Sequence, residues 1–322
     1  MRVLNDRDFD GIEWEATAVS IGAYDGVHLG HRALIGEMRS RAEVIGLASV
    51  VVTFDKHPAS VVRPDSAPML LTELDQKLEL LASTGIDGVY VINFDRSRSE
   101  QSPEQFVIGS LVETLRARLV VVGSDFHFGK GRAGNLNLLS EMGRSYGFGV
   151  EAVELMPGRL APGKNGDILA EPISSTRVRE LLMQGRVEAA AALLGRDHEV
   201  RGQVEHGDGR GGSELGCPTA NIAIPSNIAL PKDGIYAGWC RRSDGVERPI
   251  VASLGKRPTF YRDCTESLLE VHLIGFSGDL YGERLSVRFR KRLRDELRFE
   301  SVEDLVTQIR VDIDNASLIL GI

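Results

Sequence analysis

The sequence predicts an α/β protein with an N-terminal doubly wound parallel-sheet domain, followed by a small six-stranded β-barrel domain with a C-terminal helix. In the first half, short apolar runs alternate with helical patterns, which is typical of a parallel sheet covered by helices on both faces. In the second half, short strand-like runs are separated by Gly, Asp and Pro turns, which favours a small closed or Greek-key barrel. The length of 322 residues is enough for two domains with separate cores.

The elements of the first half follow from the spacing of apolar residues. Nearly all-apolar runs such as ASVVVTF are expected of strands that are buried on both faces. Leu34, Met38 and Ala42 recur at helical spacing after a glycine-punctuated loop. The predicted strands span residues 16–22, 48–54, 88–92, 119–123 and 148–155, and further helices span 72–83, 103–117 and 135–146.

The boundary between the domains is predicted where the pattern changes. The Pro/Gly-rich stretch 156–167 is expected to form a long loop. Two short helices follow, and Gly185 and Gly195 stand at their ends, as is common for helix C-termini. We therefore predict a first domain over 1–186 and a second over 187–322.

The second half supplies the strands of the barrel and a final helix. Strands are expected in the runs EVRGQV, TANIAI, GIYAGWC, PIVASLG, LLEVHLIG and ERLSVRFRKRL. The helix is predicted to begin at Ser301, with Asp304 completing a capping box. Its apolar face is expected to bury Val302, Leu305, Val306, Ile309 and Ile313 against the barrel.

Charge and cysteine content exclude several classes of protein. Lys and Arg number 38 against 46 Asp and Glu, a net charge of −8, whereas nucleic-acid and anionic-membrane binders need a basic surface. Three cysteines are an odd number and lack a C-x-x-C pair, which argues against a disulfide framework or a zinc site. With no signal peptide and no apolar run near the roughly 20 residues of a membrane span, we expect a cytoplasmic protein. Neither nucleic acid nor membrane is expected as a partner, and a weak homo-oligomer is left open.

The first motif that carries chemistry is the loop GAYDGVHLGH, residues 22–31. His28 and His31 flank Gly30 where a helix is predicted to begin. Amide groups at a helix N-terminus attract phosphate oxygens, and imidazoles can donate hydrogen bonds to them. Because short motifs often match by chance, the two histidines alone leave simple capping of the helix as the better interpretation.

A second segment, ISSTRVRELL at 173–182, changes that balance. Ser174, Ser175 and Thr176 stand at a predicted helix start, and Arg177 and Arg179 follow. Hydroxyl groups, amides and guanidinium groups together can hold a triphosphate, although a capping cluster with solvated arginines is a common alternative. Both segments in one α/β half favour a nucleotidyltransferase site.

The barrel half carries a candidate phosphate and Mg²⁺ site. Its first strand leads into a glycine-rich loop whose backbone can approach phosphates closely. Thr219 and Asn221 are two positions apart and therefore share one face of a strand, where their oxygens suit Mg²⁺. Glu270 lies on the polar face of LLEVHLIG and can accept a proton from an alcohol that attacks phosphorus. From spacing alone, a solvated glutamate and a polar strand edge remain the better interpretations.

Together these residues carry a family resemblance over nearly the whole chain. The segments G-x-Y-D-G-V-H-L-G-H, T-F-D-K-H-P, V-V-G-S-D-F-H-F-G and I-S-S-T-x-x-R resemble the adenylyltransferase module of bacterial bifunctional riboflavin kinase/FAD synthetases. The segments G-R-G-G-S-E-L-G-C-P-T-A-N-I, L-P-K-D-G-I-Y-A, L-G-K-R-P-T-F and L-E-V-H-L resemble their kinase module. The resemblance implies two ATP-dependent reactions, in which riboflavin becomes FMN and FMN becomes FAD, with Mg²⁺ as cofactor.

For the first domain, the resemblance implies that the FMN phosphate attacks the α-phosphorus of ATP. His28 and His31 would stabilise charge on that phosphorus, and Ser175, Thr176 and Arg179 would hold the departing phosphates. It further places substrate contacts at Gly22, Tyr24, Asp25, Gly30, His57, Asp125 and Phe128.

For the second domain, the resemblance makes Glu270 the base that activates the ribityl 5′-hydroxyl of riboflavin. Thr219 and Asn221 would hold Mg²⁺ and ATP. The glycine-rich loop would cover the phosphates with Gly207, Gly209, Gly211, Ser213 and Gly216.

One departure from the family pattern bears on the kinase activity. Ser213 stands where the family commonly has a basic residue, and losing an ammonium group near a triphosphate costs ~1–3 kcal/mol unless Arg210 or Lys232 compensates. We therefore expect reduced, not absent, kinase activity. The alternatives are a monofunctional FMN adenylyltransferase with an impaired kinase domain and a non-catalytic flavin-responsive regulator.

Overall fold

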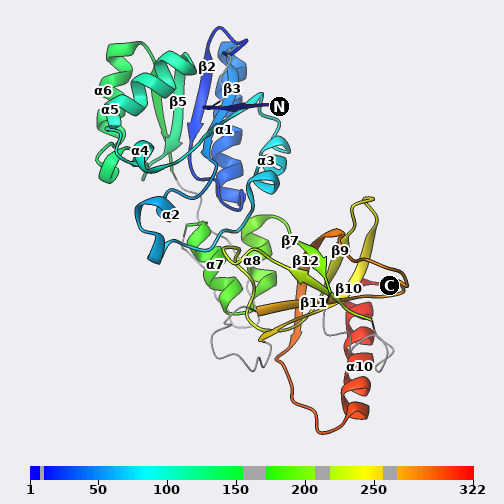
Figure 1. Ribbon diagram of the computed structural model, residues 1–322. Coiled ribbons are helices and arrows are strands. Elements are labelled where there is room, and N and C mark those ends of the chain that lie inside the picture. Colours follow the sequence, from blue (N-terminus) through cyan, green and yellow to red (C-terminus); the bar gives the residue numbers. More distant parts are fainter. Residues whose placement is uncertain (8–10, 155–171, 207–217, 257–266) are drawn as a thin grey trace. The chain divides into compact units, whose positions relative to one another are not determined.

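A computed structural model describes the chain except for residues 8–10, 155–171, 207–217 and 257–266 (Figure 1). The chain divides into two compact units, Met1–Ser175 and Thr176–Ile322. The predicted boundary at 186/187 stays a prediction. In the described part of the chain, no helix is long and apolar enough to cross a membrane.

The first unit contains a parallel sheet, as the alternating pattern predicted, and the sheet has six strands where five were expected. The strand order is β1-β4-β3-β2-β5-β6, and every neighbouring pair is parallel. The order reverses between β2 and β5, and in open α/β sheets ligands bind at the carboxyl ends of strands at such a reversal. The strands are β1 (Arg2–Asn5), β2 (Thr17–Ile21), β3 (Ala48–Phe54), β4 (Gly88–Ile92), β5 (Ala117–Gly123) and β6 (Gly149–Val153).

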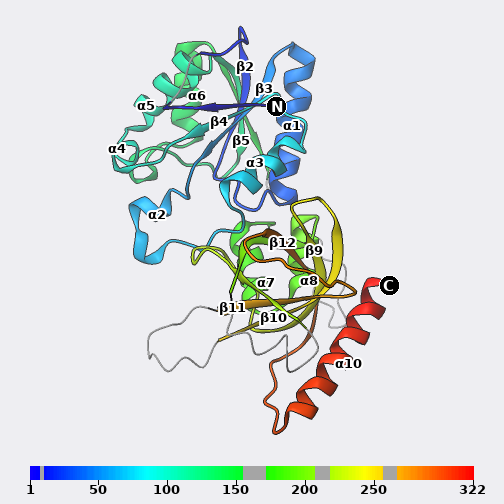
Figure 2. The same cartoon turned by 45° about the vertical axis from the view of Figure 1, so that its right-hand side comes forward.

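Helices cover both faces of this sheet (Figure 2). On one face, α1 and α3 pack Met38 and Leu81 against strand residues such as Val51. On the other, Leu111 and Leu139 pack against strand residues such as Val50. The helical segments are α1 (Leu29–Ile45), α2 (Ala59–Val62), η1 (Pro64–Ser66), α3 (Leu74–Ala82), α4 (Arg96–Ser99), α5 (Pro103–Phe106), η2 (Val107–Thr114), η3 (Lys130–Arg132) and α6 (Leu136–Tyr146).

Several features of this unit differ from the sequence prediction, including the short helices α2 and α4, which were not expected. The edge strand β1 was missed, because it is short and only Leu4 in it is fully buried. The helix expected over 103–117 is divided, with a capped α-helical turn at Pro103–Phe106 and a π-helical segment at Val107–Thr114. The Leu115 amide donates to the Ser110 carbonyl five residues earlier, at 3.1 Å, which is the backbone bond of a π-helical turn.

The second unit contains a closed barrel of six strands, as predicted, in which neighbouring strands are antiparallel. Two short helices precede the barrel. The strand order around the barrel is β10-β11-β8-β7-β12-β9. Leu269, Val271 and Leu273 point inward and are buried, so Glu270 and His272 face outward, as the alternation predicted. The elements are α7 (Ser175–Met183), α8 (Val187–Leu194), β7 (His198–Glu205), β8 (Ala220–Ala223), β9 (Gly234–Arg241), β10 (Glu247–Lys256), β11 (Ser267–Leu273), β12 (Arg284–Arg294) and α10 (Val302–Leu320).

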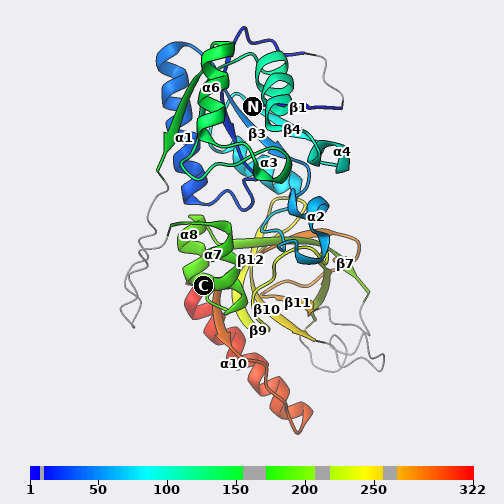
Figure 3. The same cartoon turned by 90° about the vertical axis from the view of Figure 1, so that its left-hand side faces the viewer.

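The last helix, α10, runs along the outside of the barrel beside β9, β10 and β12 (Figure 3). Its start agrees with the prediction, because the Ser301 hydroxyl accepts the Asp304 amide at 3.1 Å. The predicted buried face was partly wrong. Val302 is 53% exposed, whereas the residues that pack fully are Asp312 and Ala316. Leu305, Val306, Ile309 and Ile313 are half-buried.

A buried ion pair explains why a polar residue lies on the packed face of α10. Arg294 of β12 donates to both carboxylate oxygens of Asp312, at 3.0 and 2.6 Å, and Gln308 adds a third donor at 3.0 Å. A buried charge is tolerated when it is paired and hydrogen-bonded in this way. A polar contact of this kind cannot be found from an apolar pattern along the helix.

Candidate functional site

The loop that joins β2 to α1 has an unusual backbone. Tyr24, Gly26 and Val27 have φ values of 49°, 80° and 38°. Positive φ is easy for glycine but costly for a β-branched residue such as Val27. Strained conformations persist only where surrounding contacts hold them, and they concentrate at functional sites.

Side chains from outside the loop hold it in this conformation. The Asp25 carboxylate accepts hydrogen bonds from the Leu71 amide at 2.9 Å and the Thr72 amide at 3.1 Å. The Gly26 amide donates to the Thr72 hydroxyl at 3.1 Å. Asp25 was predicted to contact a substrate. In these hydrogen bonds its carboxylate instead accepts backbone amides of the protein and so holds the loop.

The buried Tyr24 ring fixes the loop on its inner side. Its hydroxyl lies 2.6 Å from Ser20 Oγ, which donates to the Val121 carbonyl at 2.7 Å. Burial raises the pKa of the Tyr24 hydroxyl well above its usual value, so this group stays protonated. Gly22 lies under the ring, where an added Cβ would come within 3.1 Å of Tyr24 Cε2. This contact gives Gly22 a packing role.

His28 and His31 lie where α1 begins. Nδ1 of His28 accepts the His31 amide at 3.2 Å and so caps the helix. In neutral His28 the ring proton is therefore on Nε2, which becomes a hydrogen-bond donor. The two rings stack with centroids 3.6 Å apart, and a Cβ on Gly30 would lie 3.3 Å from the His28 ring. The structure thus brings the predicted pair together.

His31 is held in its uncharged form. Burial lowers its pKa well below the usual value, and the positive charges of His28 and Lys77 lower it further. Nδ1 of His31 is buried and has no hydrogen-bond partner among the described residues. An unpaired buried nitrogen costs free energy, and such groups in native proteins are often found where function requires them.

Ser175, the first residue of α7 and the last of the first unit, contacts this loop. The Ser175 hydroxyl donates to the Asp25 carbonyl at 2.9 Å, although the two residues are 150 positions apart. Thr176 and Arg179 follow on α7 in the second unit, where Thr176 is exposed and Arg179 is half-buried. The structure therefore confirms a helix start at the I-S-S-T segment and brings its second serine to the loop.

Lys77 was not predicted as a site residue, and it contacts the same loop. Its ammonium group donates to the Phe54 carbonyl at 2.7 Å and the Ala23 carbonyl at 3.3 Å. Burial lowers the pKa of Lys77 to about 8, although the Asp25 and Asp55 carboxylates act in the opposite direction. A signal was present in the sequence, because Lys77 stands four residues before Leu81 on the buried face of α3.

His57 lies beside Lys77 in a small polar pocket. The pocket is lined by Ala23, Asp25, Asp55, His57, Thr72 and Lys77, among others. Nδ1 of His57 accepts the Ala59 amide at 3.1 Å. In neutral His57 the ring proton is therefore on Nε2 as well.

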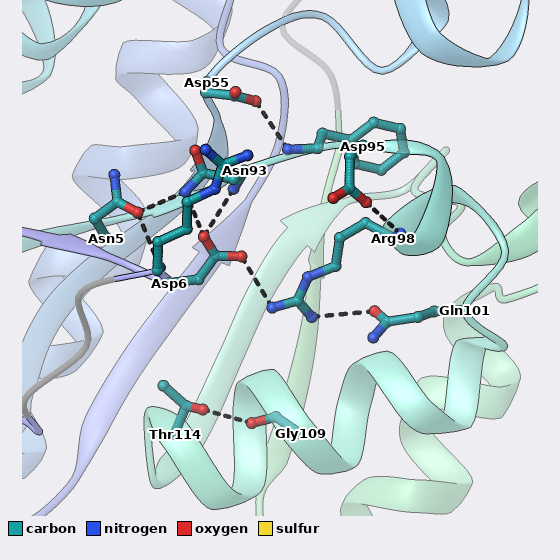
Figure 4. Close-up of polar contacts among 11 residues, drawn as sticks. Asn5, Asp6, Asp55, Asn93, Asp95, Arg98, Gln101, Gly109 and Thr114 are labelled. Carbon is teal, nitrogen blue, oxygen red and sulfur yellow. Dashed lines mark hydrogen bonds and ion pairs between the residues drawn. The ribbon is translucent and has the colours of Figure 1, made fainter.

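A polar network also fixes the loop after β4 (Figure 4). The Asp6 carboxylate accepts the Asn93 amide at 3.0 Å and pairs with Arg98 at 2.9 Å. Next to it, the Asp55 carboxylate accepts the Phe94 amide at 2.8 Å. These hydrogen bonds connect the loops that follow β1, β3 and β4 at the carboxyl ends of the strands.

Asp125 and Phe128 follow β5 and have different surroundings. The Asp125 side chain is exposed. Phe128 is 7% exposed and belongs to the core, where its ring stacks on Phe126 with centroids 5.3 Å apart. Phe126 is half-buried and so presents part of its ring outside the core.

In the barrel, strand register brings two predicted residues together. Asn221 of β8 lies directly opposite Glu270 of β11, and Glu205 of β7 lies opposite Asn221 on its other side. Directly opposed residues share a face, with Cβ atoms about 5 Å apart. Oδ1 of Asn221 is buried and has no hydrogen-bond partner in the described part of the chain.

The remaining predicted barrel residues are less fully placed. Thr219 is described and exposed, two residues before Asn221. Lys232 is paired with Asp295 at 3.1 Å, so its ammonium group already has a carboxylate partner. The following predicted residues lie outside the described residues: Gly207, Gly209, Arg210, Gly211, Ser213 and Gly216.

Comparison with known proteins matches both units. A family model described as FAD synthetase matches residues 11–159, and one described as riboflavin kinase matches residues 194–320. The bifunctional riboflavin kinase/FMN adenylyltransferase of Haemophilus influenzae is 35% identical over 94% of each chain. The protein of the same name from Escherichia coli K12 is 36% identical over 92% of this chain and 91% of its own.

Among solved structures, one described as a macrolide-efflux protein from Streptococcus pneumoniae has a TM-score of 0.81 and 27% identity. That match covers 98% of both chains. The bifunctional relatives match nearly their whole length, and the two family models fall on the two units. The chain therefore belongs to the family of bifunctional riboflavin kinase/FMN adenylyltransferases.

Proposed function

We propose that this chain phosphorylates riboflavin to FMN in its barrel and adenylylates FMN to FAD in its first unit. The observation that carries the proposal is that one chain holds both a strained, capped His28/His31 loop and an outward-facing Asn221/Glu270 pair. Family membership supports both activities. The substrates are riboflavin, FMN and ATP.

In the adenylyl transfer, an oxygen of the FMN phosphate attacks the α-phosphorus of ATP, and the bond to pyrophosphate breaks. Negative charge increases on the oxygens of the α-phosphate in the transition state. His28 presents Nε2–H as a donor, because its Nδ1 already accepts the His31 amide. Donors held in place before the reaction stabilise that charge without reorganising. Ser175, Thr176 and Arg179 would hold the departing pyrophosphate.

In the phosphorylation, the ribityl 5′-hydroxyl of riboflavin attacks the γ-phosphorus of ATP, and ADP leaves. Glu270 would accept the proton of that hydroxyl group as the new O–P bond forms. Its register position opposite Asn221 supports this role, because directly opposed residues share one face of the barrel. Phosphoryl transfer depends mainly on positioning and charge stabilisation, which a rigid barrel face can supply.

The Asn221 site fits a Mg²⁺ ion bound with ATP. Oδ1 of Asn221 is buried and has no hydrogen-bond partner among the described residues, and Thr219 with its hydroxyl group stands two residues earlier. Mg²⁺ prefers oxygen ligands and is usually held by a few protein groups together with substrate phosphates. Mg²⁺ would offset negative charge on the transferring phosphoryl group. No cluster of three or more His, Cys, Asp or Glu side chains suited to a metal occurs among the described residues.

The test is a pair of incubations of the purified chain with ATP and Mg²⁺, one given riboflavin and the other FMN. Chromatography of the flavins is expected to show FAD in both. If FAD forms only in the incubation given FMN, the adenylyltransferase activity is supported and the kinase proposal is refuted. FAD from neither would refute both and favour a flavin-responsive regulator. The expected cytoplasmic location and the weak homo-oligomer remain predictions.

A further inference from the structure

Lys77 joins two loops that carry predicted site residues. Its side chain comes from α3, and its ammonium group reaches the carbonyls of Ala23 and Phe54. Ala23 lies in the strained loop before His28, and Phe54 ends β3, three residues before His57. Lys77 is 7% exposed, so these contacts are made away from water. A single buried cation thus links the loop after β2 to the loop after β3.

Charged and titratable groups face Lys77 from each neighbouring element. Asp25 approaches from the loop after β2, His31 from α1 and Asp55 from the end of β3. Lys56 and His57 line the same pocket. The two carboxylates are held by backbone amides, Asp25 by Leu71 and Asp55 by Phe94. Lys77 is therefore surrounded by fixed groups rather than by mobile counter-ions.

We propose that Lys77 is a positioning residue for adenylyl transfer, which holds the loop of residues 22–28, and with it His28 and His31, in place relative to the end of β3. The proposal rests on the adenylyltransferase function proposed above. The Ala23 carbonyl also accepts the Thr53 hydroxyl at 3.1 Å, but only Lys77 reaches both Ala23 and Phe54 among the described contacts. Misplacing catalytic groups by about 1 Å can cost about 10²-fold in rate.

Protonation of Lys77 gives this role a pH dependence. With a pKa of about 8, Lys77 is charged below pH 8 and becomes a neutral amine above it. A charged donor makes hydrogen bonds about twice as strong as those of a neutral one. The hydrogen bonds from Lys77 to the Ala23 and Phe54 carbonyls are therefore strongest below pH 8 and weaken above it. His31 is uncharged throughout this range, because its pKa is far lower.

The experiment measures FAD formation from FMN and ATP, and FMN formation from riboflavin and ATP, in the same preparations. Lys77→Met is expected to lower kcat for FAD formation about 10-fold or more, with KM for FMN within about threefold. FMN formation by the barrel is expected to stay within about twofold and reports that the protein is folded. Arg144→Met is the control, because it removes an exposed cation from α6 of the same unit.

A pH profile separates positioning from a purely structural role. For the wild type, kcat for FAD formation is expected to fall above about pH 8. This decrease in kcat at high pH should be absent in Lys77→Met. In Lys77→Arg, which keeps the charge and recovers part of the rate, the decrease should move to higher pH. This comparison needs only the wild type and the conservative variant if Lys77→Met does not fold.

The proposal is overturned if Lys77→Met keeps the wild-type kcat and pH profile, or if Arg144→Met has the same effect as Lys77→Met. The proposal would also be overturned if Lys77→Arg and Lys77→Met lost kcat equally and Lys77→Arg did not move the decrease in kcat to higher pH. If the wild type itself makes no FAD from supplied FMN, the adenylyltransferase function fails instead. That result is distinguishable from failure of the Lys77 proposal because it involves no variant.

Discussion

The two candidate sites are assembled in different ways. In the first unit, the site lies in loops at the carboxyl ends of parallel strands, and its backbone is strained at Tyr24 and Val27. In the barrel, Asn221 and Glu270 lie on regular neighbouring strands and are brought together by register alone. The first site is held by side chains from distant segments, whereas the second is held by the hydrogen-bond ladder of the sheet.

Because of this difference, we expect substitutions to affect the two sites in different ways. A loop with unfavourable φ values depends on its anchors, such as Asp25 and Lys77, and loses its geometry when they are removed. A register position on a closed barrel is fixed by every strand pair around it, so a single substitution there removes a functional group without moving its neighbours. Variants that affect one activity and spare the other therefore test the comparison directly.

The largest effect is expected from His28→Ala combined with His31→Ala. Removing one preorganised donor from a transition state costs about 10²–10³ in rate, so the pair should lower FAD formation about 10³-fold. FMN formation from riboflavin is expected to be unchanged, because the histidines belong to the first unit. Both rates are measured by flavin chromatography under saturating substrates. FAD formation at the wild-type rate would contradict the assignment of the transferase site.

A comparable loss in the opposite direction is expected from Glu270→Ala. Removing a general base typically costs about 10²–10⁴ in rate, so FMN formation should fall by that amount. FAD formation from supplied FMN should be spared. The matched control is Glu247→Ala, an exposed glutamate of β10 that pairs with Arg288, because such surface pairs contribute little. Equal loss of both activities in Glu270→Ala would refute the independence of the two sites.

A smaller effect is expected from Asp25→Asn. The buried carboxylate accepts the amides of Leu71 and Thr72, and hydrogen bonds to charged groups are worth about 1.5–3 kcal/mol. The substitution should lower the free energy of unfolding of the first unit by about that amount. FMN formation by the barrel should be unaffected.

Calorimetric unfolding measures this loss, and Asp65→Asn serves as the control. Asp65 is exposed, so its substitution is expected to change stability by less than about 0.5 kcal/mol. If Asp25→Asn were as stable as the control, the loop would not depend on this anchor, and the contrast between the two sites would be weakened.

Much of the fold could be predicted, because patterns along the chain are local. Buried parallel strands such as Ala48–Phe54 are apolar throughout, and the turns of the barrel carry Gly, Asp and Pro. Elements that break a simple pattern were missed or misjudged. The edge strand β1 is short and half-polar, the π-helical segment Val107–Thr114 has no distinctive spacing, and Asp312 replaces an apolar residue on the packed face of α10.

The candidate sites divide in the same way. The motif residues His28, His31, Asn221 and Glu270 were identified through the family resemblance of their segments, because spacing alone favoured helix capping and a solvated strand face. Lys77 was missed, because a lysine in a helical pattern is expected to be solvated. Only the fold shows that this lysine is buried against Ala23 and Phe54.

By itself, the sequence determined most of the strands and helices and the start of the last helix at Ser301. It also indicated, through the family resemblance, which residues are candidates for binding phosphate. The tertiary structure decided which of these meet. Asp25 accepts the Leu71 amide 46 positions away, and Ser175 donates to the Asp25 carbonyl 150 positions away. Asn221 and Glu270 lie opposite each other on neighbouring strands. Such contacts depend on how segments pack and pair over long separations, and local propensity carries no information about that pairing.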